Sequence, residues 1–224
     1  MIREVQGYDT KTRSSMNTAS LSNEIGNKFE RAMVTGGAGF IGSHIIESLL
    51  DTGIEVISVD DFAAGKKENI APFLSNPRFT SAKCDVTDYD SLKKCFDGVD
   101  VVFHEAASKK NVCMKDPRRD LLVNGAGAFN ILEIARDLGV KKVVHASTGS
   151  VYGEAQVLPQ TEEHPLNPVS YYGVSKLAGE RYAKTFEHLY DLDTTILRYF
   201  HVYGPRQESG EFGGVIAIFA RQLL

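Results

Sequence analysis

The sequence predicts an α/β protein built on a doubly wound parallel sheet. Six short strand-like runs alternate along the chain with segments of helical periodicity. A turn with four glycines joins the first of these runs to the first helical segment. This alternation is typical of parallel sheets, whose ligands bind at the carboxyl ends of the strands.

The elements follow one another in a regular order. The expected strands are residues 32–34, 54–60, 78–82, 100–104, 142–146 and 194–198. Helices are expected directly after the glycine turn, from about Pro117 to Leu138, around Tyr172, and from Val215 to Leu224. In the first helix, Ile41, Ile45 and Leu49 recur at helical spacing.

The glycine turn predicts a dinucleotide site of the Rossmann type. Gly36 would permit the tight turn, Gly39 would let a pyrophosphate approach the backbone, and Gly42 would let the helix pack closely on the strand. The free N–H groups at the start of the helix would then point at the anion. A glycine pattern alone is weak, but here a strand precedes it and a helix follows.

An acidic residue ends the second strand. Asp60 lies 18 positions after Gly42 (60 − 42), near the offset at which a carboxylate binds the adenosine ribose. Such a carboxylate repels a 2′-phosphate and favours NAD over NADP; the alternative is an aspartate that only opens a loop. After the third strand, Asp85 could reach the adenine edge, and Thr87 or Asp88 could cap a helix.

Acid–base groups follow the fifth strand. Tyr172 and Lys176 stand four positions apart, so they share one face of the expected helix. A lysine ammonium beside a phenol favours the phenolate and is expected to lower the pKa of Tyr172. The Thr148 hydroxyl could hold the reacting oxygen of a substrate while a nicotinamide moves a hydride.

Composition excludes several other classes of function. The chain has 224 residues, 42% of them hydrophobic, and a formal net charge of −4, which argues against a nucleic-acid partner. Three scattered cysteines indicate reduced thiols, and the histidine spacing gives no support for a metal site. No apolar run reaches membrane-spanning length, so a cytoplasmic protein without a membrane partner is expected. Residues 1–30 read as a polar, poorly ordered leader, and residues 31–224 as the NAD-binding domain with the start of a substrate-binding part.

Taken together, these stretches resemble the extended short-chain dehydrogenase/reductases, especially the enzymes similar to UDP-glucose 4-epimerase. The resemblance covers residues 31–224. It rests on the following matching stretches: Thr35–Gly42, Val59–Phe62, Cys84–Asp88, His104–Ala107, Ser147–Gly153, Tyr172–Lys176 and Leu197–Arg206.

The resemblance implies a role for each matched position. Tyr172 would be the catalytic acid/base, Lys176 would bind the nicotinamide ribose and tune Tyr172, and Thr148 would hydrogen-bond the sugar. The implied cofactor-binding residues are Gly36, Gly39, Phe40, Ile41, Gly42, Asp60, Asp61, Asp85, Val86, Ala106, Ala107, Asn124, Ser147, Tyr172, Lys176 and Tyr199. The implied substrate contacts are Lys109, Thr148, Tyr172 and His201, with no metal.

The function implied is 4-epimerisation of a UDP-hexose by NAD through a transient 4-keto sugar. The alternatives are a dehydratase or decarboxylase of the same family and a non-catalytic NAD-binding protein. Dehydratases resembled here usually carry an Asp-Glu pair after the threonine, where this chain has Gly149 and Ser150, and this favours the epimerase. A homodimer is implied through the helices that begin near Pro117 and Val169.

Two positions and the end of the sequence depart from the family pattern. His201 stands where asparagine is usual, which indicates either a tolerated variation or an altered substrate contact. Glu105 is unusual at a position that is normally apolar or neutral. The sequence stops at Leu224, whereas relatives continue, so we expect the C-terminal substrate domain to be largely missing and the last strand to have an open edge.

Overall fold

A computed structural model describes residues 28–108, 110–209 and 214–223 of the chain. The leader predicted for residues 1–30 therefore lies outside the described residues, apart from its last three positions. No helix in the described part of the chain is both long and apolar enough to cross a membrane.

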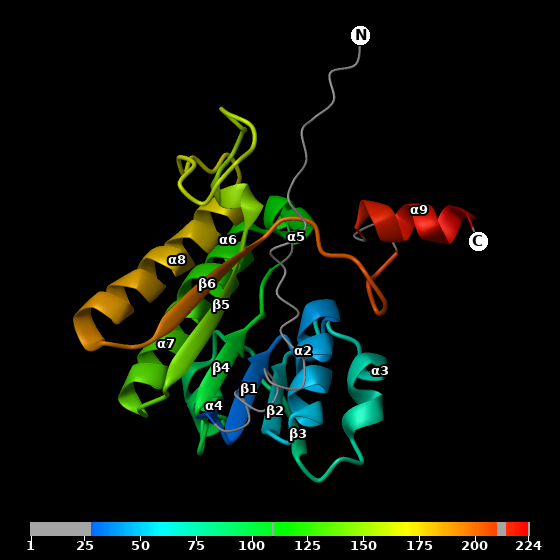
Figure 1. The fold of residues 1–224 in the computed structure, drawn as a ribbon, viewed down its shortest axis with the longest axis vertical. Coiled ribbons are helices and arrows are strands. Elements are labelled where there is room, and N and C mark those ends of the chain that lie inside the picture. Colours follow the sequence, from blue (N-terminus) through cyan, green and yellow to red (C-terminus); the bar gives the residue numbers. More distant parts are fainter. Residues whose placement is uncertain (1–27, 109, 210–213, 224) are drawn as a thin grey trace, which may run out of the picture.

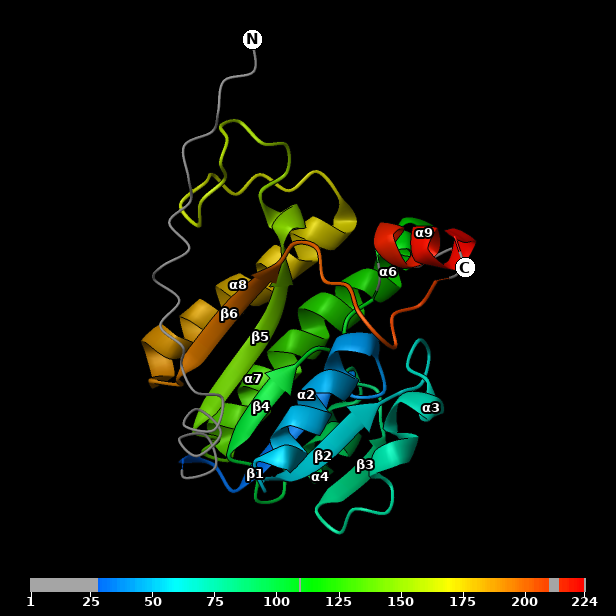
Figure 2. The ribbon, with the colours of Figure 1, turned by 45° about the vertical axis from the view of Figure 1, so that its right-hand side comes forward.

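The six predicted strands form one parallel sheet in the order β3-β2-β1-β4-β5-β6 (Figure 2). The strands are β1 (Arg31–Thr35), β2 (Glu55–Asp60), β3 (Phe79–Lys83), β4 (Val101–His104), β5 (Lys142–Thr148) and β6 (Thr194–Tyr199). Thr35, at the end of β1, stands opposite Val59 on one side and His104 on the other. The strand ends are thus aligned along one edge of the sheet, and the strand order reverses between β1 and β4.

Helices cover both faces of the sheet (Figure 1). They are α2 (Phe40–Asp51), α3 (Lys67–Ile70), η2 (Ala71–Phe73), α4 (Tyr89–Lys94), α5 (Lys110–Lys115), α6 (Pro117–Asp120), η3 (Leu121–Gly127), α7 (Ala128–Asp137), η4 (Gly149–Val151), α8 (Tyr171–Tyr190) and α9 (Val215–Leu223). The doubly wound arrangement predicted from the sequence is confirmed.

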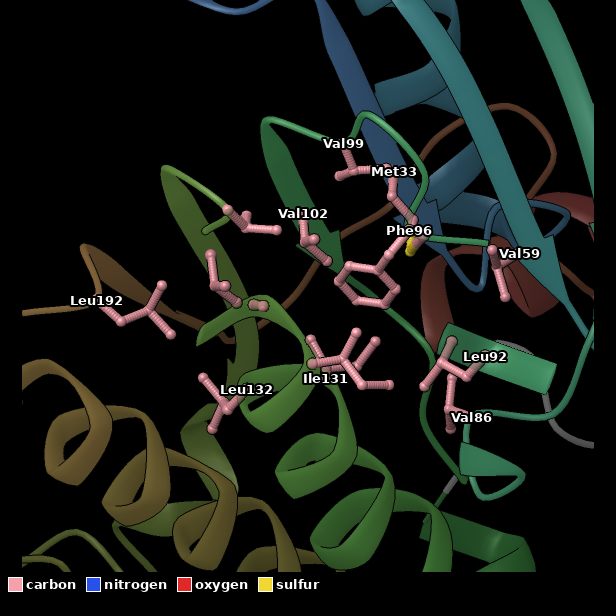
Figure 3. Close-up of a cluster of buried hydrophobic side chains, with 14 of the residues drawn as sticks. Met33, Val59, Val86, Leu92, Phe96, Val99, Val102, Ile131, Leu132 and Leu192 are labelled. Carbon is pink, nitrogen blue, oxygen red and sulfur yellow. The ribbon is translucent and has the colours of Figure 1, made fainter. Parts of the chain in front are cut away.

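The core divides into two clusters because side chains on a strand alternate between the two faces of the sheet. Met33 and Val59 point to the cluster under α4, α7 and α8, where Phe96 and Ile131 are also buried (Figure 3). On the other face, Val34 and its neighbours pack against the apolar side of α2. Both faces are thus covered, as expected for a parallel sheet.

The stretch expected as one helix from about Pro117 to Leu138 has three parts in the structure. A short helix α6 leads into η3, which is a π-helical turn, and α7 continues from it. Asn124 lies inside this π turn and is 1% exposed. Because π turns cluster at functional sites, this difference from the prediction draws attention to the neighbourhood of Asn124.

Helix α8 carries the predicted acid–base pair near its start. The Ser170 hydroxyl accepts a 3.1 Å hydrogen bond from the Gly173 N–H and caps the helix. The helix ends at Tyr190 and is followed by its C-cap Asp191, whose φ of 54° lies in the left-handed region. Its first two turns thus hold Tyr172 and Lys176 at a fixed place beside β5.

Strand β6 is the edge strand of the described sheet and pairs with β5 along its length. A cleft of about 940 Å³ follows the other side of β6 and is lined in part by Arg181, Lys184 and Leu197. The expectation of an open edge at the last described strand is therefore confirmed.

Candidate functional site

A cavity of about 580 Å³ opens at the carboxyl edge of the sheet. Its walls come from segments that directly follow β1, β2, β3 and β4, and from the last residues of β5 and β6. It lies where the strand order reverses between β1 and β4, which is where open α/β sheets bind ligands.

The glycine turn forms the floor of this cavity. Gly36 has a φ of +65°, and a Cβ there would come within 2.8 Å of the Ala106 nitrogen. A methyl group on Gly42 would overlap the Gly36 carbonyl oxygen, so the close approach of α2 to β1 requires glycine. The tight turn at Gly36 and the close packing at Gly42 thus agree with the sequence, whereas their part in cofactor binding stays a prediction.

Helix α2 presents its N-terminus to the cavity. Gly39 is its N-cap in extended conformation, and no side chain in the described chain caps it. The first turn carries no acidic residue. The free N–H groups and the helix dipole therefore favour an anion at this point.

Asp60 lies at the end of β2 and is 7% exposed. Its Oδ2 accepts a 2.9 Å hydrogen bond from the Ala38 N–H, and its Oδ1 accepts a 2.8 Å bond from the Phe62 N–H. Burial raises the pKa of Asp60 and outweighs these two bonds, which lower it. Because each carboxylate oxygen has a further lone pair, Asp60 can still accept from ribose hydroxyls.

Two other aspartates line the same end of the cavity and share one arginine. Nη2 of Arg119 on α6 lies 2.7 Å from Asp85 Oδ2 and 3.1 Å from Asp61 Oδ2. Burial raises the pKa of Asp85, but hydrogen bonds from Thr87 and Arg119 outweigh it and hold that pKa below its usual range. Of the predicted capping residues, Asp88 caps α4 by accepting from the Ser91 N–H at 3.1 Å.

Tyr172 is partly buried and Lys176 is buried, and both line the cavity, one helical turn apart on α8. Burial raises the pKa of Tyr172, and a hydrogen bond with Thr148 opposes this effect. The expected lowering of the Tyr172 pKa is therefore wrong for this structure, because burial of the phenol, together with the charges of Asp120 and Glu105, outweighs the hydrogen bond with Thr148.

Lys176 has the opposite response to burial. Desolvation lowers its pKa from 10.5 to about 8, against the charges of Glu105, Glu180 and Asp120. Behind it, His104 and His145 are buried with their rings 5.3 Å apart. Within the described residues their Nε2 atoms have no hydrogen-bond partner.

Glu105 and Ser147 bring further charge and polarity to the strand ends. Glu105 follows β4 and lines the cavity, and its carboxylate accepts a 3.0 Å hydrogen bond from the Tyr199 hydroxyl. Burial raises the pKa of Glu105. The Ser147 hydroxyl donates to Glu180, which also forms a two-bond salt bridge with Arg198.

Asn124 lies outside the cavity lining and holds residues next to it in place through hydrogen bonds. Its Oδ1 accepts a 2.8 Å hydrogen bond from the Ser108 N–H, and its Nδ2 donates to Asp120 at 2.7 Å and to Ser175 at 3.2 Å. It thus ties the segment after β4 to α8. The structure gives Asn124 a positioning contact, where the sequence suggested that it borders a cofactor.

Most of the predicted cofactor-binding residues meet around the cavity. The lining includes Gly36, Gly39, Phe40, Ile41, Gly42, Asp60, Asp61, Asp85, Val86, Ala106, Ala107, Ser147, Tyr172, Lys176 and Tyr199. Thr148, Asn124 and His201 are not part of the lining, and His201 is exposed. Lys109 lies outside the described residues.

Sequence reasoning missed several lining residues. They include Lys66, Asn69, Arg119, Arg206 and Gln207. Arg206 reaches the cavity because the segment after β6 lies against α2. There the Arg206 guanidinium donates a 3.2 Å hydrogen bond to the Ser43 carbonyl oxygen. Only the three-dimensional contacts reveal these residues, since a polar side chain in a surface helix or loop gives no signal of its own.

The residues present fit a dinucleotide such as NAD. The glycines of the floor line the cavity without side chains, and the α2 N-terminus supplies donors for a pyrophosphate. Asp60 supplies acceptors for a ribose at one end, and Lys176 supplies a donor at the other. Across the described residues, no group of three or more His, Cys, Asp or Glu side chains is placed to hold a metal ion.

Comparison with known proteins finds relatives along most of the chain. A UDP-glucose 4-epimerase of Mycolicibacterium smegmatis is 41% identical over 199 residues, which cover 87% of this chain and 63% of that protein. The solved UDP-glucose 4-epimerase of Thermotoga maritima, with UDP-glucose, superposes with a TM-score of 0.80 at 37% identity. That match covers 86% of this chain and 62% of the Thermotoga maritima chain. The solved UDP-glucose 4-epimerase of Thermus thermophilus, in complex with NAD, superposes with a TM-score of 0.77 at 42% identity. That match covers 85% of this chain and 61% of the Thermus thermophilus chain.

Relatives with other activities match as well. They include a UDP-glucuronic acid decarboxylase of Arabidopsis thaliana, 34% identical over 89% of this chain and 46% of that protein. The chain spans about three fifths of the length of the UDP-glucose 4-epimerases that it matches. The profile of the NAD dependent epimerase/dehydratase family matches residues 32–224. The chain therefore belongs to the NAD dependent epimerase/dehydratase family.

Proposed function

We propose that the protein uses NAD to interconvert the 4-epimers of a UDP-hexose. The observation that carries this proposal is the position of Tyr172 and Lys176 on the wall of the cavity that also contains the glycine turn and Asp60. A proton-transfer pair and a dinucleotide site thus face the same space. The similar proteins named above, which include several UDP-glucose 4-epimerases, support the same reaction.

In this proposal Gly36, Gly39 and the N-terminus of α2 hold the pyrophosphate, Asp60 holds the adenosine ribose, and Lys176 holds the nicotinamide ribose. Bound NAD would supply the acceptor, and then the donor, of a hydride at C4 of the sugar. Tyr172 Oη takes the proton of the C4 hydroxyl as the 4-keto sugar forms, and returns it after the sugar has turned over.

Two neighbours prepare Tyr172 for this task. The hydrogen bond from Thr148 lowers the Tyr172 pKa against the effect of burial. The pKa of Lys176, about 8, keeps its side chain mostly in the positively charged form near neutral pH. An ammonium on the same wall of the cavity favours the phenolate once Tyr172 gives up its proton.

The residues after Thr148 favour epimerisation over dehydration. Eliminating water needs an acid and a base next to the threonine, and this chain has Gly149 and Ser150 there. A Cβ at Gly149 would come within 2.9 Å of the Phe200 ring, so an acidic side chain at 149 would force Phe200 to move. A dehydratase or a decarboxylase is the second candidate because a decarboxylase is among the relatives.

We further propose a homodimer that forms through η3 and α8, with a cytoplasmic location. Leu121 and Leu122 on η3, and Val174 and Tyr182 on α8, are exposed apolar side chains on two helices that pack together. Sedimentation of the protein and of a Leu122→Glu variant tests the dimer. We expect the variant to sediment as a monomer.

The function is tested by calorimetry with a panel of UDP-hexoses at saturating NAD, followed by product analysis. We expect one sugar nucleotide to bind and to yield its 4-epimer with no change in mass. Loss of water would indicate a dehydratase, and loss of carbon dioxide from a UDP-uronic acid would indicate a decarboxylase. Normal NAD binding without binding of any UDP-hexose would contradict the proposal for this chain.

A further inference from the structure

Arg119 forms a bridge between two strand ends. A single guanidinium nitrogen lies 2.7 Å from an oxygen of Asp85, which follows β3, and 3.1 Å from an oxygen of Asp61, which follows β2. All three side chains are about one-third exposed and line the cavity. The bridge lies at the same end of the cavity as Asp60.

Local hydrogen bonds fix both carboxylates independently of the arginine. Asp61 Oδ1 accepts from the Ala63 N–H at 2.9 Å. Asp85 Oδ1 accepts from both the N–H and the hydroxyl of Thr87, each at 2.9 Å. Each aspartate therefore turns its second oxygen toward Arg119, and the guanidinium meets two preorganised acceptors.

This arrangement bears on which nucleotide the site accepts. A guanidinium is the side chain best suited to a phosphate, and an arginine near the ribose commonly accommodates the 2′-phosphate of NADP. Here Nη2 of Arg119 is already paired with two carboxylates, and a phosphate could bind that nitrogen only by displacing them. Lys66, a second cation in the lining, lies 3.9 Å from Glu208.

We propose that Asp61 and Asp85 keep Arg119 from binding a 2′-phosphate, so that the Asp61–Arg119–Asp85 bridge, together with Asp60, makes the site selective for NAD over NADP. This inference rests on the proposed use of NAD. It assigns Arg119 a specificity role rather than a catalytic one. It also implies that the chain already contains the cation that an NADP site needs.

The test is calorimetric binding of NAD and NADP to the unchanged protein and to the Asp61→Asn/Asp85→Asn variant. Asparagine keeps the shape of both side chains and removes their charge. We expect the ratio Kd(NADP)/Kd(NAD) to fall about tenfold or more, which is what one charge-assisted hydrogen bond to phosphate supplies. Adding Arg119→Gln should abolish most of that gain, whereas Arg118→Gln, at an exposed neighbour on α6, should leave it intact.

An unchanged ratio in the double variant contradicts the inference. So does a fall that persists without Arg119, since repulsion by the carboxylates alone would then explain the selectivity. Thermal unfolding checks that the variants are folded, and the single Asp61→Asn variant should show a smaller shift in the same direction. Failure of the unchanged protein to bind NAD would contradict the proposed function as well, whereas NAD binding with an unchanged ratio contradicts only the role of the bridge.

Discussion

The Tyr199 hydroxyl donates a 3.0 Å hydrogen bond to Oε1 of Glu105 and so joins the end of β6 to the segment after β4. Strand β5 lies between these two strands, so the bond spans the part of the cavity wall that holds Ser147. Tyr199 belongs to a stretch that matches the family pattern, and Glu105 is one of the departures from it. The carboxylate is thus a fixed part of the site.

The first prediction concerns the effect of that carboxylate on Lys176. Burial lowers the pKa of Lys176 to about 8, and the charge of Glu105 is the largest influence that opposes it. A Glu105→Gln variant keeps an acceptor for Tyr199 and loses the charge. We expect the pKa of Lys176 to fall below its value in the unchanged protein, measured by NMR of isotope-labelled lysine.

The matched control for this variant is Glu163→Gln, because Glu163 is an exposed carboxylate on the loop before α8. It should leave the Lys176 titration where it is. A Glu105→Gln variant in which Lys176 titrates as before, or at higher pH, would show that the two groups do not interact.

The second prediction tests the packing of the glycine turn. Gly42→Ala places a methyl group against the Gly36 carbonyl oxygen, which is backbone and cannot move aside cheaply. We expect a loss of about 1–3 kcal/mol in the free energy of unfolding and a marked loss of NAD affinity, because the turn under the pyrophosphate must shift.

Gly53→Ala is the comparison for that experiment. Gly53 has a φ of +89° and open space around its Cβ position, so only backbone strain of about 1 kcal/mol is expected. Its NAD affinity should equal that of the unchanged protein. If Gly42→Ala also binds NAD normally in calorimetry, the close contact at Gly42 does not support the site.

The third prediction concerns the buried salt bridge under β6. Glu180 is 3% exposed and accepts bonds of 2.9 and 2.8 Å from Arg198, which also donates to the Tyr152 hydroxyl at 2.7 Å. Removing the carboxylate in Glu180→Ala leaves a partly buried guanidinium without its partner. We expect a cost of about 3–5 kcal/mol in denaturant unfolding.

An exposed ion pair on the same helix is the control for this loss of unfolding free energy. Lys184 and Glu187 lie 2.9 Å apart on the surface of α8. Lys184→Ala should cost less than about 1 kcal/mol. Equal losses in the two variants would mean that burial adds nothing to the Glu180–Arg198 pair.

The fold was predictable because its signals are local. The apolar residues of each strand and each helix recur with a spacing that is typical of that element. The glycine pattern around Gly36 is in turn typical of the tight strand-to-helix turn of a dinucleotide site. The π turn at Asn124 was not predictable, since it depends on bonds to Ser108 and Ser175 from segments distant in sequence. The helix propensity of residues 117–138 predicts one continuous α-helix and gives no sign of the π turn.

The part of the candidate site that was predictable consists of residues at or near the carboxyl ends of the strands, because these ends meet at one edge of the sheet. Asp60, Tyr172 and Lys176 reach the cavity because they follow elements whose order the sequence shows. Arg119 was missed, since a surface helix gives no sign that its arginine reaches back to β2 and β3. The raised pKa of Tyr172 was also missed, because burial cannot be judged from a four-residue spacing.

The fourth prediction concerns stability at low pH. Burial, together with the nearby charge of Lys176, lowers the pKa of His104 from 6.5 to about 3, and the pKa of His145 is also well below its usual value. Below pH 6.5 the unfolded chain therefore takes up protons that the folded chain does not. Each histidine then costs about 1.4 kcal/mol of stability per pH unit as the pH falls below 6.5, and for His104 this loss continues to a pH of about 3.

A His145→Gln variant should thus lose less stability than the unchanged protein when the pH falls from about 7 to about 5. Thermal unfolding at both pH values measures the difference. His188→Gln, at an exposed position near the end of α8, should behave like the unchanged protein. An identical fall in Tm for His145→Gln would show that His145 takes up its proton in the folded state.

The central claim is that Tyr172 moves the proton in a site that binds NAD independently of it. The most direct test measures UDP-hexose epimerisation and NAD affinity together in a Tyr172→Phe variant. We predict a loss of turnover of about a hundredfold or more, with the Kd for NAD essentially unchanged. Turnover by Tyr172→Phe at the rate of the unchanged protein would contradict the account.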